Sequence, residues 1–419
     1  MLEIAVIADD LTGAADTGVQ FCRLARPNYL LAASALATAQ FPDSPKAVTV
    51  HTSSRHLPPL AARNAVTQAA RALKSFQPSL IYKKIDSCLR GNLGPEIDAL
   101  LEELGLEQAF VAPAFPAQGR LTIHDEHLIH GIPLGKTEIA KDPINPVKCS
   151  LVSEVIAAQT CHDVGVVDIE ATAKGSKELE QAVSSLLKKG TKIIVFDACE
   201  QEHLENIARL SLDRYPGSLL VGSAGLALGL AEVVTQRQGK KQATSPSTQG
   251  SLLFVGGSAS ARLADQHEAL VAQNQASQMI LDAEMLADPK AREQRRKWGD
   301  EAAVSLAQTN LVLRITPPEE NKSKPSSEAV AQGLAQVAAA AALTSSPAGM
   351  FLSGGDTAQA VFEQLEVQAV ELHAEVLPGL VWGTIMGGPQ NGGLVVTKAG
   401  AFGEDDDLVK LHGLLCGQA

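Results

Sequence analysis

Short apolar runs alternate along the whole chain with stretches of helical periodicity. The runs that read as strands are Ile4–Ala8, Ala47–His51, Leu80–Lys83, Ala109–Ala112, Gly165–Asp168, Lys192–Asp197, Leu252–Gly256, Leu311–Ile315, Gly349–Ser353 and Gly393–Lys398. Helical patterns lie between them, for example at Pro95–Leu104, Lys177–Lys189, Ala261–Gln273 and Thr357–Leu365. This alternation is typical of α/β proteins with parallel strands. We therefore predict an α/β fold in which largely parallel sheets are flanked by helices.

One polar stretch divides the pattern into two series of strands. The segment from Arg237 to Ser251 contains almost no apolar residue and is rich in Gln, Ser, Thr and Gly. A chain of 419 residues is also too long for one ordinary core. We predict two domains, 1–236 and 251–419, joined by a linker at 237–250, each built around its own parallel sheet.

Charge and cysteine usage narrow the function classes. A formal net charge of −12 argues against nucleic acid as the main partner. The N-terminal run has no basic leader and no apolar stretch long enough to span a membrane, so no membrane partner is expected. The six cysteines are scattered, with no C-x-x-C pair and no Cys/His ligand spacing. We expect reduced thiols in the cytoplasm, and no metal site.

The segment 82–91, YKKIDSCLRG, combines charged, hydroxyl and thiol side chains within a short stretch of the chain. Lys83, Lys84 and Arg90 supply three cations, and Asp86 supplies a carboxylate, directly after an apolar strand. Charges of this density need partners if they are buried, and a small anion would provide one. The alternative is a solvated strand end with an internal Lys–Asp pair. The segment alone does not decide between the two.

Two other strand ends in the first half carry polar groups. Asp9 and Asp10 follow the first strand, and Arg55 follows the second in the segment HTSSR. Ligands of open parallel sheets bind at the carboxyl ends of the strands. Asp10 is therefore a candidate to accept a hydroxyl proton or to orient a hydroxyl group. Capping of the following helix is the alternative role for one of the two aspartates.

Glycine-rich turns dominate the second half. GGSAS follows the strand that ends at Gly256, and SGGDTA follows another strand. Such turns present backbone N–H groups at a helix N-terminus, where phosphate binds well. Lys398 ends a further strand before the glycines of KAGAFG, and its ammonium could reach phosphate oxygens. The chain has no Walker A motif, no protein-kinase motif set and no Rossmann fingerprint, so a phosphate site of another design is predicted.

Taken together, these segments resemble the four-carbon acid sugar kinase family over nearly the whole chain. The resemblance rests on seven motifs in order: ADDLTGAADTG, KKIDSCLRG, APAFPAQGR, GSAGLA, GGSAS, SGGDTA and TKAGAFG. It implies a sugar-acid site at Asp10, Arg55, Lys83, Lys84, Ile85 and Asp86, to which we add Arg90. It implies an ATP site at Ser258, Gly354, Gly355, Asp356, Thr357 and Gly400, to which we add Lys398. Cys88 departs from the family pattern, which usually has Thr at this position.

The resemblance implies phosphorylation by ATP and Mg²⁺ of the terminal (4-) hydroxyl of threonate, erythronate or 3-oxo-tetronate in carbohydrate catabolism. Asp10 or Asp86 would take the hydroxyl proton, while Lys83, Arg55 and Arg90 would hold the carboxylate. Three alternatives stay open: a Schiff-base aldolase using Lys83 or Lys84, an aspartyl phosphatase, and a non-enzymatic sensor of a sugar acid. A homodimer is expected, as for many soluble enzymes of this size.

Overall fold

A computed structural model describes residues 2–142, 144–238, 246–257, 260–273, 275–316, 325–400 and 402–417. The chain separates into two compact units, Met1–Gln242 (unit 1) and Ala243–Ala419 (unit 2). Half of the predicted linker, 239–245, lies outside the described residues. Its first two residues belong to a helix that ends at Gln238. In its described end, the Thr248 N–H donates to the Leu415 carbonyl of unit 2 at 2.8 Å.

Unit 1 is built from alternating strands and helices. Its strands are β1 (Ile4–Ala8), β2 (Asn28–Ala32), β3 (Ala47–His51), β4 (Leu80–Lys84), β5 (Ala109–Ala112), β6 (Arg120–Ile123), β7 (Glu126–Ile129), β8 (Ile132–Pro133), β9 (Val164–Val167), β10 (Ile193–Phe196) and β11 (Leu219–Gly222). Its helices are α1 (Leu11–Phe21), α2 (Pro59–Lys74), α3 (Leu93–Leu104), α4 (Val152–Ala157), α5 (Ile169–Lys174), α6 (Ser176–Leu187), α7 (Gln201–Arg214) and α8 (Ala224–Gln238).

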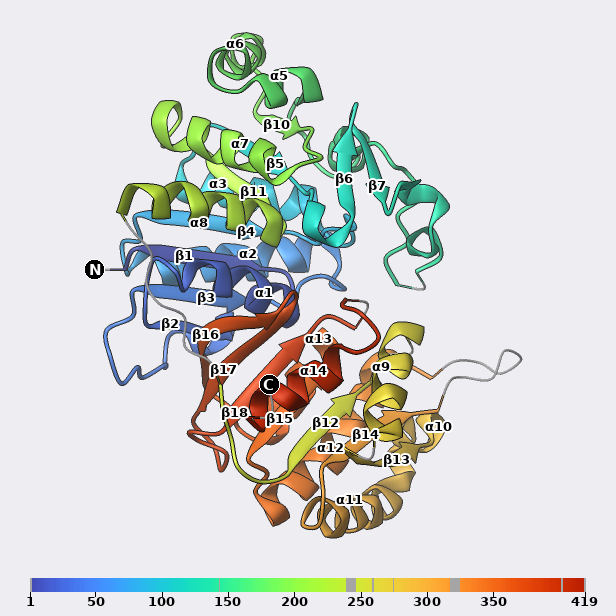
Figure 1. Cartoon of the computed structure of the whole chain (residues 1–419). Coiled ribbons are helices and arrows are strands. Elements are labelled where there is room, and N and C mark those ends of the chain that lie inside the picture. Colours follow the sequence, from blue (N-terminus) through green and yellow to red (C-terminus); the bar gives the residue numbers. More distant parts are fainter. Residues whose placement is uncertain are drawn as a thin grey trace. The chain divides into compact units, whose positions relative to one another are not determined.

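The main sheet of unit 1 runs in the order β2-β3-β1-β4-β11-β5-β10-β9. Every pairing in it is parallel. Helices α1, α8 and α7 pack side by side on one face, and α2 and α3 pack together on the other (Figure 1). Because both faces are covered, strands such as β1 are buried along their whole length, which explains their continuous apolar sequences.

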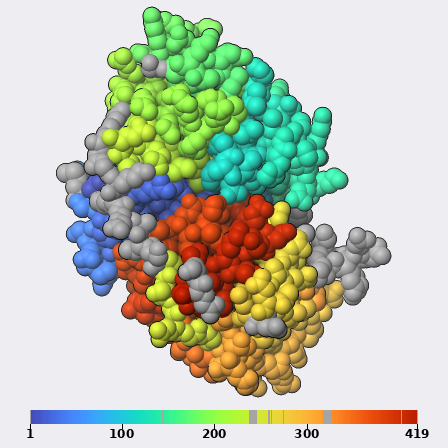
Figure 2. Space-filling model, in the orientation of Figure 1, coloured from blue at the N-terminus to red at the C-terminus, as the bar shows by residue number. Residues whose placement is uncertain are grey.

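The core of unit 1 is filled by aliphatic side chains around a few aromatic rings. Tyr82 meets Phe21 edge to face, and Phe110 meets Phe196 in the same way. The antiparallel strands β6, β7 and β8 form a separate small sheet. Strands β6 and β7 stand at one side of the unit (Figure 1), where the residues of this segment are teal in the space-filling view (Figure 2). A bridge between Thr122 and Ala198 ties this small sheet to the loop after β10.

Unit 2 has a second sheet, in the order β13-β14-β12-β15-β18-β17-β16. Its strands are β12 (Leu252–Gly256), β13 (Ser277–Leu281), β14 (Leu311–Ile315), β15 (Gly349–Ser353), β16 (Ala369–Leu377), β17 (Leu380–Met386) and β18 (Leu394–Lys398). Its helices are α9 (Ala261–Ala272), α10 (Ala283–Ala287), α11 (Arg292–Leu306), α12 (Ser327–Ser345), α13 (Gly355–Gln364) and α14 (Asp407–Leu415). The five strands β13, β14, β12, β15 and β18 pair in parallel. Strands β17 and β16 form an antiparallel hairpin, and β17 pairs antiparallel with β18.

The predicted fold class is confirmed: the protein is α/β, with largely parallel sheets flanked by helices. Six of the ten predicted strands have the predicted bounds, and the other four differ by one residue at one or both ends. The strands that sequence reasoning did not propose include β2, β11 and β13 and the hairpin β16–β17. Helix α3 begins two residues before the predicted start.

Candidate active site

Three neighbouring strands of unit 1 bring the predicted sugar-acid residues to one edge of the sheet. Ala8, the last residue of β1, pairs with His51 of β3 on one side and with Lys84 of β4 on the other. Polar residues that follow these strands must therefore emerge side by side at the carboxyl edge. The sequence-predicted residues from Asp10 to Arg90 are assembled there.

Arg55 is the centre of this cluster. Its Nε donates to Asp9 Oδ2 and its Nη2 donates to Asp10 Oδ1, both at 2.7 Å. Asp86 Oδ1 lies 3.9 Å from the same Nη2. Burial alone would lower the pKa of Arg55, but the three carboxylates raise it well above its usual range, Asp10 most. We call Arg55 and the three aspartates the Arg55 cluster.

Asp10 also caps helix α1. Its Oδ1 accepts the Gly13 N–H at 3.0 Å, and its Oδ2 accepts the Thr12 hydroxyl at 2.9 Å. The capping role left open for one aspartate is therefore confirmed for Asp10. Asp9 carries the other bond to Arg55, and its Oδ1 is buried with no hydrogen-bond partner among the described residues. Burial would raise the pKa of Asp9, but Arg55, Lys84 and Lys83 lower it.

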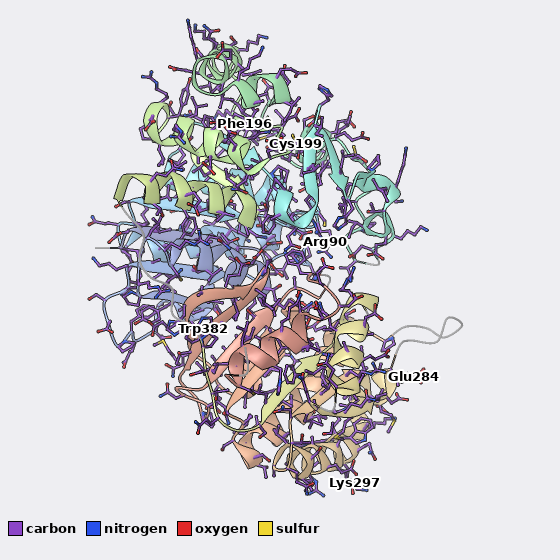
Figure 3. All side chains as sticks on the ribbon, viewed as in Figure 1. Arg90, Phe196, Cys199, Glu284, Lys297 and Trp382 are labelled. Atoms are coloured by element: carbon purple, nitrogen blue, oxygen red, sulfur yellow. The ribbon has the colours of Figure 1, made fainter. Side chains whose placement is uncertain are left out.

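Asp86 and Arg90 form a second pair in the loop after β4. Arg90, labelled in Figure 3, donates from Nε to Asp86 Oδ2 at 2.6 Å and from Nη2 to Oδ1 at 3.3 Å. Its Nη1 lies 3.5 Å from Asp142 Oδ2. Burial would raise the pKa of Asp86, but Arg90 and Arg55 hold it far below its usual range. Asp86 is thus ionised at neutral pH and has arginine donors at both oxygens.

Lys83 and Lys84 point to opposite faces of the sheet, as adjacent strand residues must. Lys83 is fully buried on the face of α3, where its Nζ lies 2.6 Å from Glu96 Oε2 and donates to the Lys84 carbonyl at 2.8 Å. Glu96 also accepts the Ser54 hydroxyl at 2.6 Å. The solvated strand end is therefore wrong for Lys83, because this cation is buried and paired.

Lys84 lies on the face of α1 and has fewer partners than Lys83. Its Nζ donates to the Ile85 carbonyl at 2.8 Å, and no ion pair to it is found among the described residues. A Cβ on Gly13 would lie 2.9 Å from this Nζ and 2.4 Å from Asp10 Oδ1. Only glycine at this position leaves room for both groups. The Ile85 side chain is buried, and its N–H donates to the Gly222 carbonyl.

The loop that carries Asp86 is held from the small sheet by His127, which sequence reasoning did not single out. His127 Nε2 lies 2.8 Å from the Ser87 carbonyl oxygen, and its Nδ1 lies 3.0 Å from Thr122 Oγ1. Burial lowers the pKa of His127 to about 4, so the neutral ring donates to the carbonyl through Nε2. Cys88 in the same loop is buried, and burial raises the pKa of its thiol.

In unit 2 the predicted nucleotide residues also lie at a carboxyl edge. Gly256 of β12, Ser353 of β15 and Lys398 of β18 are paired in register across three neighbouring strands. The two glycine turns follow Gly256 and Ser353 directly. Ser258 lies outside the described residues, so the structure does not place it.

Gly354 occupies the N-cap of α13 with a φ of +95°, a region that favours glycine. Gly355 and Asp356 begin the helix, and the Asp356 side chain is exposed. Thr357 packs against the first glycine turn, since a Cβ on Gly257 would lie 2.1 Å from Thr357 Oγ1. The two turns therefore meet closely, with backbone N–H groups at the helix start.

Lys398 is buried and holds the third loop of this edge. Its Nζ donates to the carbonyls of Phe402 at 2.8 Å, Ala399 at 3.1 Å and Gly400 at 3.4 Å. Burial lowers the pKa of Lys398 to about 8. In this structure Lys398 orders the glycine loop through backbone carbonyls, and its predicted contact with phosphate stays a prediction.

Two buried polar groups at the same edge were missed by sequence reasoning. Ser353 Oγ and His267 Nε2 are buried and have no hydrogen-bond partner among the described residues. His267 lies against β12, since a Cβ on Gly256 would be 2.3 Å from its Cε1. Burial lowers the pKa of His267 to about 3, so the ring is neutral. Unpartnered buried groups at a phosphate-type turn indicate where a ligand can supply hydrogen bonds.

Comparison with known proteins finds a family model for each of two parts of the chain. Residues 4–230 match the family model described as a sugar-binding N-terminal domain, and residues 253–408 match one described as a nucleotide-binding C-terminal domain. A D-erythronate kinase of Heliobacterium modesticaldum is 33% identical over 97% of this chain and 95% of its own length.

The chain belongs to the four-carbon acid sugar kinase family. A D-threonate kinase of Salmonella typhimurium is 31% identical over 99% of this chain and 100% of its own. A solved structure from Salmonella typhimurium LT2 shares the fold with a TM-score of 0.82 and 22% identity, covering 98% of this chain and 99% of that chain. The protein is accordingly a phosphotransferase that acts on an alcohol group of a sugar acid, as expected from the sequence.

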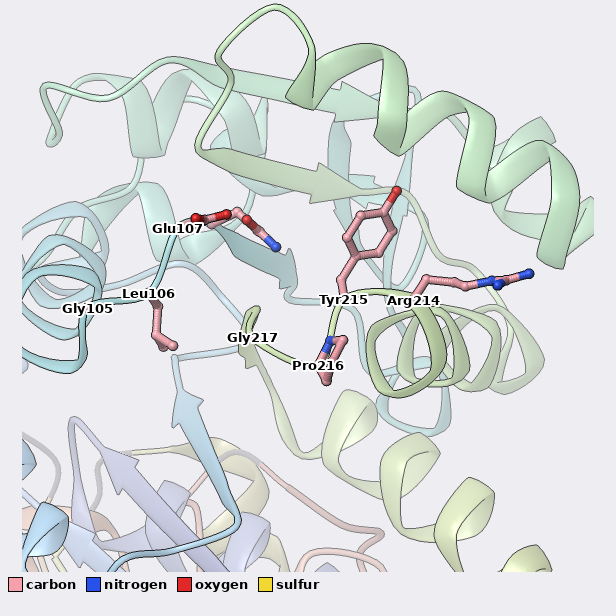
Figure 4. Close-up of a pocket in the computed structure, with 8 residues that line it drawn as sticks. Gly105, Leu106, Glu107, Arg214, Tyr215, Pro216 and Gly217 are labelled. Carbon is pink, nitrogen blue, oxygen red and sulfur yellow. The ribbon is translucent and has the colours of Figure 1, made fainter.

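One surface hollow of this sugar-acid kinase lies away from the predicted site. It has a volume of about 340 Å³ and is lined by Gly105–Gln108 and Arg214–Gly217 (Figure 4). These segments precede β5 and β11, so the hollow lies at the amino ends of the parallel strands. The Arg55 cluster follows the carboxyl ends, at the opposite edge of the same sheet. Among the described residues, no helix is long and apolar enough to cross a membrane.

Proposed function

We propose that the protein transfers the γ-phosphoryl group of ATP to the terminal (4-) hydroxyl of a four-carbon sugar acid in carbohydrate catabolism. The observation that carries the sugar-acid assignment is the pairing pattern around the Arg55 cluster. Arg55, Arg90 and Lys83 all form ion pairs with protein carboxylates. Lys84 has one carbonyl partner for three ammonium donors. A substrate carboxylate would supply the direct ion-pair partner that Lys84 lacks among the described residues.

In this proposal Lys84 binds the acid directly, and Arg55, Lys83 and Arg90 hold the aspartates and the loop in place. Arg55 and Arg90 each keep guanidinium N–H groups beyond those given to the aspartates, since an arginine has five. Those groups are available to substrate hydroxyls or to the carboxylate. Ile85 contributes through its carbonyl, which fixes the Lys84 ammonium.

Proton transfer needs a carboxylate oxygen that is not already saturated with donors. Both oxygens of Asp10 and both oxygens of Asp86 accept bonds in this structure. Asp9 Oδ1 accepts none from the described residues. Asp10 and Asp86 stay the sequence-predicted acceptors, and we add Asp9 because its second oxygen is available. The hydroxyl oxygen forms the new bond to phosphorus, ADP leaves, and the carboxylate takes the proton.

We assign the nucleotide to the edge of unit 2 that carries Gly354–Thr357, Lys398 and Gly400, and we keep Ser258 as a sequence-predicted contact. Backbone N–H groups at the start of α13 suit phosphate oxygens, and Ser353 Oγ is an unused hydroxyl beside them. Mg²⁺ is bound in such sites through one or two carboxylates and the phosphates themselves. The exposed Asp356 carboxylate in the first turn of α13 fits that role. Bound Mg²⁺ would neutralise phosphate charge.

Among the acids, we propose erythronate or threonate in preference to a 3-oxo acid. Relatives named D-erythronate kinase and D-threonate kinase are 31–33% identical to this chain. Relatives named 3-oxo-tetronate kinase are 25–27% identical. We also propose that the reaction takes place in the cytoplasm, where ATP is supplied. The predicted homodimer stays a prediction that light scattering in solution can test.

The test is ADP release by the purified protein with Mg-ATP and a panel of D- and L-erythronate, D- and L-threonate and their 3-oxo forms. Turnover with an erythronate or threonate supports the proposal and names the isomer. Turnover with only a 3-oxo acid overturns the substrate choice. If no acid in the panel causes ADP release although the protein still binds ATP, the acid assignment is overturned and the nucleotide site is kept.

A matched pair of variants tests the role of Lys84. Lys84→Met removes the ammonium that we assign to the substrate carboxylate, so KM for the acid should rise strongly while ATP affinity is kept. Lys46→Met removes a half-buried lysine of unit 1 that pairs with Glu3 outside the Arg55 cluster, and should leave both constants unchanged. Equal KM values for the two variants would show that Lys84 does not bind the acid.

A further inference from the structure

Unit 1 brings together a thiol, an imidazole and a carboxylate outside the Arg55 cluster. Asp98 lies in the middle of α3, and Cys161 and His162 lie in the segment between α4 and β9. One ligand-type atom from each of the three side chains lies within 4.8 Å of the other two. The His162 Nε2 and Asp98 Oδ1 atoms are 3.9 Å apart. The cluster reaches the surface through Cys161, which is exposed.

The segment that carries Cys161 and His162 is fixed against α3. A Cβ on Gly94 would lie 2.6 Å from the backbone carbonyl carbon of Gln159, so the two backbones touch. The Gly94 N–H also donates to Gln159 Oε1 at 3.2 Å. Glycine at position 94 is what allows this approach. The distance between Asp98 and the cysteine–histidine pair is therefore set by backbone packing.

Thr160 links the carboxylate to the segment. Its Oγ1 donates to Asp98 Oδ1 at 2.7 Å and accepts the His162 N–H at 3.1 Å. Asp98 Oδ1 has a second lone pair beyond the one that accepts from Thr160, and Oδ2 accepts no hydrogen bond from the described residues, so the carboxylate can still bind a metal ion. Hydrogen bonds that orient ligand side chains from behind are usual around protein metal sites.

We propose that Asp98, Cys161 and His162 bind a Zn²⁺ ion. Thiolate sulfur, imidazole nitrogen and carboxylate oxygen are the ligands of zinc, whereas Mg²⁺ and Ca²⁺ are held by oxygen ligands. Ligand bonds of about 2.0 to 2.3 Å with tetrahedral angles place neighbouring ligand atoms roughly 3.3 to 3.8 Å apart. The observed 3.9 Å between nitrogen and oxygen is close to that range, so small side-chain rotations complete the site. Water takes the fourth position.

The proposed site would link two elements, α3 and the segment before β9, that are not neighbours in the sheet. Zinc would tie α3 to the connection that enters β9, and the thiol would release its proton to solvent as the zinc–sulfur bond forms. None of the three ligands bonds to the Arg55 cluster in the described part of the chain. The proposal therefore stands apart from the kinase reaction.

Metal binding by the full-length protein tests the proposal, with Co²⁺ as a spectroscopic probe and Zn²⁺ as its competitor. Wild-type protein should bind one Co²⁺ with a thiolate-to-cobalt charge-transfer band and tetrahedral d–d bands, and Zn²⁺ should displace it. Cys161→Ser should lose the charge-transfer band, and His162→Ala should lose binding. Thr160→Val should weaken binding by about 10- to 100-fold. Cys149→Ser removes another thiol of unit 1 outside the cluster and should bind Co²⁺ like the wild type.

Three outcomes would overturn the proposal: no charge-transfer band, a band that survives in C161S, or binding only at a large excess of metal. Thermal unfolding with and without Zn²⁺ gives a second readout. Zinc should raise the melting temperature of the wild type and of C149S and leave those of C161S and H162A unchanged. Kinase turnover of C161S in Mg-ATP should equal that of the wild type. An equal rise in all four proteins would place the zinc elsewhere.

Discussion

Lys83 and Glu96 form a fully buried ion pair, with 2.6 Å between Nζ and Oε2, at the point where β4 meets α3. Removing one partner leaves an uncompensated charge in the core. Glu96→Gln should therefore destabilise unit 1 by about 3–5 kcal/mol, measured by urea unfolding of the full chain. The paired replacement Lys83→Met with Glu96→Leu should recover much of that loss, because it removes both charges.

The double variant also shows whether Lys83 only stabilises the fold or also contacts the acid. If Lys83 serves only to hold Glu96 and β4, the refolded double variant keeps measurable turnover. If Lys83 also contacts the acid, the double variant folds and shows a raised KM. A Glu96→Gln protein within about 1 kcal/mol of the wild type would contradict the stabilising role that we give to the pair.

Acid sensitivity should follow from Asp86. Its pKa in the folded protein lies below that of an unfolded chain, which is about 3.9. The stability that Asp86 provides is therefore present above pH 4 and is lost as the pH falls below it. Asp86→Asn should cost about 3 kcal/mol at neutral pH and flatten the fall in stability below pH 4. Asp43→Asn, at an exposed position, should leave the acid unfolding profile unchanged.

Gly13 should be intolerant of the smallest side chain. Gly to Ala inside a helix usually stabilises by about 0.5–1 kcal/mol. At Gly13, however, the methyl group would press on Asp10 Oδ1 and Lys84 Nζ. Gly13→Ala should raise KM for the acid by about tenfold or more, since about 1.4 kcal/mol of lost binding is a factor of ten. Gly413→Ala, in α14 with open space around the new Cβ, is the matched control. Wild-type kinetics in G13A would contradict the assignment of this edge.

ATP binding should take up a proton near pH 8 if Lys398 faces the phosphates. Burial holds the pKa of Lys398 at about 8, and a phosphate would raise it by favouring the ammonium form. ATP affinity should then fall above pH 8, by up to about tenfold per pH unit. Calorimetry in buffers of different ionisation enthalpy measures the uptake. Lys398→Met should abolish it, while exposed Lys410→Met should not. Uptake that persists in K398M would assign the proton to another group.

Much of the fold was predictable because buried parallel strands such as β1, β3 and β12 are short, mostly apolar and buried along their whole length. The missed hairpin β16–β17 did carry a signal, since Pro378 and Gly379 separate two strand-like runs. The edge strand β13 carried little signal, because alternate residues such as Gln278 and Ile280 are exposed. Weak burial at a sheet edge leaves a weak pattern.

The residues of the candidate site were predictable where they follow strands, and their partners were not. Asp10, Arg55 and Asp86 were assigned to one site and lie together, although their roles stay predictions. Glu96 looked like an ordinary residue in the first turn of a helix, and His127 had no motif around it. Their roles depend on which helix face meets β4 and on how the small sheet packs. Those are properties of tertiary structure that sequence spacing does not contain.

The strand order β3-β1-β4 places the first strand of the chain between two strands that come later. Asp9 and Asp10 therefore meet Arg55 only after β3 has paired, and meet Lys84 only after β4 has paired on the other side. A nascent chain that ends before β4 carries Asp9, Asp10 and Arg55, two carboxylates with one cation, and still lacks Lys84 and Asp86. Folding of this region is consequently a non-local event, in which electrostatic balance is reached only when the middle of the sheet closes.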